Sequence, residues 1–155
     1  MAISSQPTTI IVDVANVMGS RPDGWWRDRP GAAARLYTEI ARLAATGRAI
    51  VPTSETSATP EAPAVPGASA AQDTPPGFVM VLEGAANKAA SRLEPNDRVR
   101  VVQAAGSGDD AIVAVARELP GRRVVVTADR ELRQRCVAAG ATVLGPGWLL
   151  ALLRA

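Results

Sequence analysis

Polar side chains with the potential for chemistry follow several apolar, β-branched runs of this chain. Most of them are carboxylates, and the others are an amide and a hydroxyl within three residues of a carboxylate. The set is Asp13, Asn16, Glu83, Asp109, Asp110, Thr127 and Asp129. Asp13 belongs to an otherwise apolar run, IIVDV, where an unpaired charge is costly. We therefore expect Asp13 to bind a metal ion or to take part in catalysis.

The five carboxylates of this set would repel one another if they lay together, and a cation would relieve that repulsion. The chain has no histidine, and Cys136 is its single cysteine. Catalytic triads and dyads that use histidine, histidine-ligated zinc and disulfide frameworks are therefore excluded. Oxygen ligands alone favour Mg²⁺ or Mn²⁺. The residues thus predict an acidic site for one of these ions.

The surrounding pattern alternates short β-branched runs with longer amphipathic ones, which is typical of repeated strand-helix units. We expect strands at 10–14, 78–82, 98–103, 123–127 and 141–144, and helices at 30–46, 85–93, 109–119, 129–139 and 146–153. The predicted fold is α/β, a three-layer α/β/α sandwich with a mainly parallel five-stranded sheet. In such a sheet ligands bind beyond the carboxyl ends of the strands, where the acidic residues fall.

Length and composition favour one domain spanning residues 1–155, since 155 residues with 47% apolar and 21% charged side chains suffice for a single core. Residues 48–77 are rich in proline and alanine, and we expect a flexible insertion there, with 49–51 docked on the core. No apolar run approaches the roughly 20 residues of a membrane span, and the N-terminus lacks the pattern of a secretory signal. The expected location is the cytoplasm, with no membrane partner.

Four segments together resemble the PIN-like nucleases of the NYN (YacP-like) branch. They are IVDVANV at 11–17, WWRDR at 25–29, GSGDDAIV at 106–113 and VVVTADRELRQRC at 124–136. Members of that family show an Asp-x-x-Asn turn after the first strand, an acidic pair that opens the helix after the third, and a Thr/Ser-x-Asp-Arg turn after the fourth. Val14 stands where that family often has glycine, and the insertion has no counterpart in it.

The resemblance implies a PIN-like fold and metal-dependent hydrolysis of RNA phosphodiester bonds by an acidic cluster. It assigns catalysis and metal binding to Asp13, to Asp109 or Asp110, and to Asp129, with Asn16 and Thr127 assisting at the substrate. Glu83, a further candidate metal ligand, matches a more variable position. Bound Mg²⁺ or Mn²⁺ would activate a water for attack on phosphorus.

An acidic pocket repels a polyanion, so cations must hold the RNA, whether single-stranded or structured, nearby. Arginines beside two tryptophans suit a single-strand clamp, with phosphates on guanidinium groups and bases stacked on indoles. The candidates are Arg21, Trp25, Trp26, Arg27 and Arg29, together with Arg130. We expect one of the two neighbouring tryptophans to be packed and the other to be partly exposed.

Each candidate also has a structural alternative. Asp109, Asp110 and Asp129 could serve only as helix caps, and Asn16 as a turn residue. A signalling domain of the response-regulator type fits less well, because it needs a lysine near the acidic pocket and the single lysine, Lys88, falls in a predicted helix. A haloacid dehalogenase phosphatase also fits less well, because it needs an Asp-x-Asp motif after the first strand and Ala15 stands at the second aspartate position. A non-catalytic RNA-binding or protein-interaction module remains the main alternative. The apolar segment 147–155 leaves a homodimer open.

Overall fold

The computed structural model describes residues 7–47, 49, 51 and 75–154 of the chain. Most of the expected insertion at 48–77 therefore lies outside the described residues. Two of its residues are described near its start, and both are buried in the core: Ala49 is 3% exposed and Val51 is 2% exposed. The next strand begins at Gly77, the last residue of the expected insertion.

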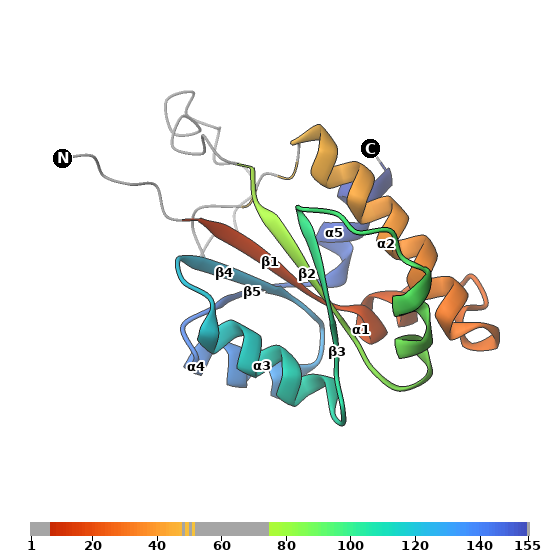
Figure 1. The fold of residues 1–155 in the computed structure, drawn as a ribbon. Coiled ribbons are helices and arrows are strands. Elements are labelled where there is room, and N and C mark those ends of the chain that lie inside the picture. Colours follow the sequence, from red (N-terminus) through yellow and green to blue (C-terminus); the bar gives the residue numbers. More distant parts are fainter. Residues whose placement is uncertain (1–6, 48, 50, 52–74, 155) are drawn as a thin grey trace.

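Five parallel strands form one sheet in the order β3-β2-β1-β4-β5, with β1 at its centre (Figure 1). Their bounds are β1 Thr8–Asp13, β2 Gly77–Leu82, β3 Val99–Gln103, β4 Arg122–Val126 and β5 Thr142–Leu144. This arrangement confirms the expected α/β fold with a parallel five-stranded sheet.

Helices cover both faces of the sheet, which explains why the central strands β1 and β2 are apolar along most of their length. One face carries α1 (Val14–Gly19), α2 (Arg29–Thr46), the 3-10 helix η3 (Gly84–Arg92) and α5 (Pro146–Arg154). The other carries α3 (Gly108–Glu118) and α4 (Arg130–Ala138). Successive strand residues point to opposite faces, so Ile10 and Val12 pack under α2, whereas Ile11 packs under α3 and α4.

Each of the five expected helices begins and ends within one residue of its predicted bounds, although η3 is a 3-10 helix. Among the described residues, two short helices were not predicted: α1, and the 3-10 helix η1 (Trp25–Arg27). The prediction that the first strand includes Val14 is wrong, because α1 begins at that residue. The physical reason is Asp13, whose side chain accepts the Asn16 backbone N–H and so starts a helix without a break in the apolar run.

The order of the strands fixes where a site can form. After β1, the chain adds β2 and β3 on one side, then crosses the sheet to place β4 and β5 on the other side of β1. The order of the strands therefore reverses between β1 and β4, and the carboxyl ends of these two strands form the topological switch point of the sheet. Open α/β sheets bind ligands at such a point, because the connecting loops diverge there and leave space between them.

Arg123 on β4 contacts the carboxyl ends of helices α3 and α4. Its guanidinium donates hydrogen bonds to the carbonyl oxygen of Ala116 in α3 and, at 3.4 Å and 3.1 Å, to those of Ala139 and Gly140 after α4. A cation suits the negative ends of helix dipoles.

Across the part of the chain that is described, no helix is long and apolar enough to span a membrane.

Candidate active site

Asp13 is the last residue of the central strand β1 and lies at the topological switch point between β1 and β4. It is 7% exposed. Its Oδ1 accepts the backbone N–H of Asn16 at 3.3 Å, and its Oδ2 accepts the hydroxyl of Thr127 at 2.8 Å. A buried carboxylate with a hydrogen bond to each oxygen has a fixed position.

Thr127 links Asp13 to the loop after β4. This fully buried hydroxyl donates to Asp13 and accepts the backbone N–H of Asp129 at 3.1 Å. The Asn16 side-chain oxygen accepts the backbone N–H of Ala128 at 2.9 Å, which joins α1 to the same loop. Asp129 in turn accepts the Leu132 backbone N–H at 2.9 Å and caps α4. These bonds hold the ends of β1 and β4 together.

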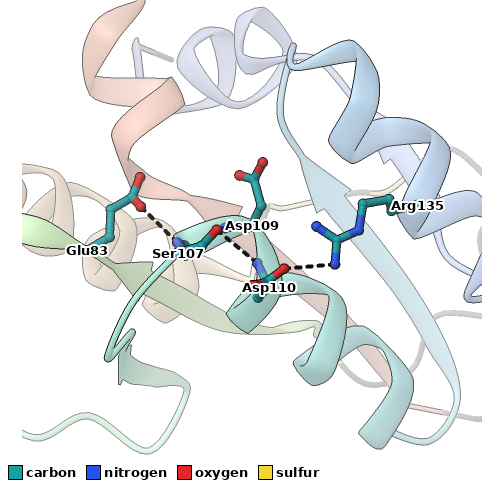
Figure 2. A network of polar contacts seen from close by, with 6 residues as sticks. Glu83, Ser107, Asp109, Asp110 and Arg135 are labelled. Carbon is teal, nitrogen blue, oxygen red and sulfur yellow. Dashed lines mark hydrogen bonds and ion pairs between the residues drawn. The ribbon is translucent and has the colours of Figure 1, made fainter.

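Glu83 lies at the end of β2 and contacts the start of α3. Its Oε1 accepts the backbone N–H of Gly108 at 2.8 Å. A Cβ at position 108 would lie 2.7 Å from that oxygen, so a larger residue there would displace the Glu83 carboxylate from this hydrogen bond. Ser107 caps α3 by accepting the backbone N–H groups of Asp109 and Asp110 at 3.1 Å and 3.4 Å (Figure 2).

The two neighbouring acids of α3 have different surroundings. Asp110 is exposed and forms an ion pair with Arg135 of α4, with 2.9 Å between Oδ1 and Nη2. Figure 2 shows the Asp109 carboxylate directed away from this ion pair. Successive helical residues point about 100° apart, which explains the difference. Of the pair, Asp109 is the acid that shares the electrostatic surroundings of Asp13.

Burial raises the pKa of the Asp13 carboxyl. The hydrogen bonds that it accepts from Thr127 and Asn16 lower this pKa, and the negative charges of Asp109 and Glu83 raise it. Burial also raises the pKa of Asp109, and the nearby charges of Asp129 and Glu83 raise it further, against a smaller opposing effect of Arg135. Four of the five predicted carboxylates therefore act on one another electrostatically. Their mutual repulsion makes this edge of the sheet attractive to a cation.

The donor chemistry suits Mg²⁺ or Mn²⁺, because this edge offers carboxylate and amide oxygens and no histidine. The arrangement is more open than the sequence suggested: within residues 7–47, 49, 51 and 75–154, no three acidic or cysteine side chains gather closely enough to hold an ion. Mg²⁺ usually keeps several waters and needs only one or two protein carboxylates. The residues at this edge fit that mode of binding.

The tryptophan pair divides as expected. Trp25 is partly buried and packs against the core, whereas Trp26 is 55% exposed. Their rings meet edge to face, with centroids 6.0 Å apart. Arg29 lies over the Trp25 ring, 5.3 Å from its centroid, and Arg27 lies over Trp26 at 5.7 Å.

The remaining predicted cations have different surroundings. Arg21 pairs with Glu39 of α2, with 2.8 Å between Nη1 and Oε1, and this ion pair takes up part of its hydrogen-bonding capacity. Arg130 is exposed at the first turn of α4, next to Asp129.

A cavity of about 240 Å³ lies beside the acidic edge, between α1, η1 and the ends of β2 and β3. Trp25, Arg29 and Glu83 contribute to its wall, together with small or apolar residues. Sequence reasoning did not find this cavity, because small residues at a loop carry no motif. It also missed Ser107 and Gly108, although a serine three residues before an acidic residue at a helix start is a recognisable cap pattern.

No family model matches this chain, and no curated protein matches it in sequence. Among solved structures, a mutant of Rae1 (YacP) from Bacillus subtilis is similar to it, with a TM-score of 0.60. The match covers 94% of this chain and 74% of that one, at 16% sequence identity. The likeness supports the PIN-like, YacP-like fold that the sequence motifs indicate, and at this identity it concerns the fold alone.

Proposed function

We propose that this protein is a ribonuclease that hydrolyses RNA phosphodiester bonds with the help of Mg²⁺ or Mn²⁺, at the carboxyl edge of its sheet. The observation that carries the proposal is the buried carboxylate of Asp13 at the topological switch point of the sheet. Its pKa is raised by burial and by the charges of Asp109 and Glu83. An arrangement that lowers the stability of the folded chain at neutral pH suggests a functional role. The likeness in fold to Rae1 (YacP) is consistent with it.

Asp13 and Asp109 are the residues best suited to hold the ion, with Asp129 and Glu83 contributing negative charge nearby. When bound, the ion would lower the pKa of a water and offset the negative charge that develops at phosphorus. Thr127 and the Asn16 backbone N–H keep the Asp13 carboxylate in place. Asp110, which pairs with Arg135, has a smaller role in this proposal.

RNA would approach along η1 and the start of α2, where cations and aromatic rings lie together. Exposed Trp26 offers a surface on which a base can stack, and Arg27 and Arg29 offer charge for phosphates. Arg130 extends the positive charge to the other side of the acidic edge. Arg21 contributes less, because Glu39 balances its charge.

The second candidate function is an RNA-binding or protein-interaction module without catalysis on the same fold. One observation favours it: among the described residues, no three acidic side chains form a ready-made metal site. The two functions differ in their response to a divalent ion, since only the nuclease requires one.

The deciding experiment measures cleavage of a fluorescently labelled single-stranded RNA, with the melting temperature of the protein followed in parallel. We expect cleavage with Mn²⁺ or Mg²⁺ and none in EDTA. An ion that binds the folded state at 100 times its Kd adds about 2.7 kcal/mol to the free energy of unfolding. Cleavage that persists in EDTA would contradict the proposed metal dependence. RNA binding with neither cleavage nor metal-dependent stabilisation would establish the second candidate.

A further inference from the structure

The cavity beside the acidic edge is distinct from the carboxylates proposed to hold the ion. It holds about 240 Å³ and is only partly open to solvent. Pockets for drug-sized ligands span roughly 300–1,000 Å³, so this one suits a smaller group, of the size of a single nucleobase. It also lies next to the loop that carries Trp25 and Trp26, where the RNA is proposed to bind.

One part of its wall is suited to a flat aromatic ligand. The Arg29 guanidinium lies over the Trp25 indole, and both residues line the cavity. Nucleobases stack on indole rings and on guanidinium planes alike. Ala15, Met18 and Ala86 add small or apolar surface, which favours a ring over a phosphate.

Of the described residues that line this cavity, Glu83 is the one with an acidic side chain. A carboxylate only accepts hydrogen bonds, at about four lone-pair positions, and the Gly108 backbone N–H uses one of them. The remaining positions can accept hydrogen bonds from a ligand with N–H donors. A buried or half-buried carboxylate also repels any ligand that presents an acceptor at the same place.

The four bases differ in what their pairing edges offer to such a carboxylate. Guanine presents two neighbouring donors, N1–H and the N2 amino group, which match the two oxygens of a carboxylate. Adenine and cytosine present one amino group beside a ring nitrogen that is an acceptor, and uracil presents one N–H between two carbonyl acceptors. Charge-assisted pairs with two parallel hydrogen bonds are the stronger and more selective ones.

We propose that this cavity is a guanine-selective subsite, in which Arg29 and Trp25 contact the ring and Glu83 accepts its N1–H and N2–H donors. As a subsite for RNA, it rests on the proposed function and adds a base preference to it. Guanine of a free nucleotide would present the same chemistry, so the test includes both sources.

The test uses ¹⁵N–¹H spectra of the full chain in EDTA, so that binding is observed without cleavage. The probes are the four nucleoside monophosphates, and uridine hexanucleotides with and without a single guanine. We expect guanosine monophosphate to shift the Trp25 indole signal and the backbone signals of Gly84 and Gly106. Its affinity is expected to exceed that of the other monophosphates at least about tenfold. The guanine-containing hexanucleotide should bind more tightly than free guanosine monophosphate if the strand is the natural source.

Two variants with matched controls test the assignment. Glu83→Gln keeps an acceptor for Gly108 but turns an amide donor toward guanine, so the preference for guanine should be lost; Glu118→Gln, on the exposed end of α3, should retain it. Ala15→Leu fills the cavity and should abolish binding at these signals, whereas Ala114→Leu, on an exposed face of α3, should not.

Equal affinity for all four monophosphates would overturn the subsite, and so would undiminished guanine preference in Glu83→Gln. Its failure is distinguishable from failure of the proposed function. Metal-dependent cleavage without any guanine preference would leave the nuclease in place and remove the subsite. Guanine-selective binding at these signals by a protein that cleaves no RNA would retain the subsite and reject the nuclease.

Discussion

The two halves of the acidic edge differ in how their carboxylates are held. At the ends of β1 and β4, Asp13 is buried, Thr127 is fully buried, and hydrogen bonds join both to the loop that carries Asp129. Two hydrogen bonds in this half, from the Thr127 hydroxyl to Asp13 and from the Ala128 backbone N–H to Asn16, join parts of the chain that are more than 110 residues apart. We call the residues Asp13, Asn16, Thr127 and Asp129 the buried half.

At the end of β2 and the start of α3, Glu83 and Asp109 are half-buried and Asp110 is exposed, and the partners of Glu83 and Asp110 each lie 25 residues away along the chain. Ser107 caps the helix that presents Asp109, and Asp110 pairs with Arg135 in solvent. We call the residues Glu83, Asp109 and Asp110 the exposed half. The comparison indicates that the buried half fixes the geometry of the site, while the exposed half supplies charge next to it.

The largest effect is expected from Asp13→Asn, because the buried half then loses its most deeply buried carboxylate. We expect RNA cleavage to fall at least about 100-fold, the scale of losing one preorganised electrostatic group in an active site. Initial rates with Mn²⁺ measure this. Asp28→Asn is the matched control, since Asp28 caps α2 in the same way and lies outside the acidic edge. Equal losses in both variants would mean that Asp13 serves only as a cap.

Within the exposed half, Asp109→Asn and Asp110→Asn should differ. Asp109 shares its electrostatic surroundings with Glu83 and Asp129, so its neutralisation should remove most of the stabilisation by Mn²⁺. Asp110 belongs to an exposed ion pair, and such pairs contribute about 0–1 kcal/mol. Melting temperatures with and without Mn²⁺ give the comparison. If Asp110→Asn has the larger effect, the proposed division of roles in α3 is reversed.

Thr127→Val tests whether the buried half depends on its hydroxyl. The substitution removes a donor to Asp13 and an acceptor for the Asp129 N–H, and a buried group left without a partner costs about 1–3 kcal/mol. Urea unfolding in EDTA measures the loss. Thr127→Ser keeps the hydroxyl, and should cost only about the 0.8 kcal/mol expected for a methyl group. A similar loss in both variants would assign the effect to packing alone.

The smallest effect concerns pH. Because the pKa of Asp109 is raised in the folded state, its contribution to stability is complete below the ordinary value of about 3.9 and is lost as pH rises through the folded pKa. Asp109→Asn removes this loss, so in EDTA near pH 7 its melting temperature should exceed that of the wild type by at most a few degrees. The difference should shrink toward acidic pH. A variant that melts lower than the wild type at pH 7 would contradict the repulsion inferred for this edge.

Much of the fold was predictable, because local patterns and tertiary packing agree along most of the chain. Pro30 and Gly47 mark the ends of α2 to within one residue, and Pro120 follows α3. The start of α1 was not predictable from periodicity. Its first residue, Val14, continues an apolar run, and the only local sign of a helix is the cap formed by Asp13.

The identities of the acidic residues, and the prediction that they gather at one edge of a parallel sheet, follow from the sequence. The sequence determined both because local periodicity sets the strands and helices, and because the carboxyl ends of parallel strands lie at the same edge of the sheet. Only the tertiary structure decided that Asp109 shares the surroundings of Asp13 while Asp110 pairs with Arg135, that Glu39 balances Arg21, and that Glu83 lines a cavity. Those outcomes depend on helix rotation and on contacts between segments far apart in the chain, and no local pattern specifies either.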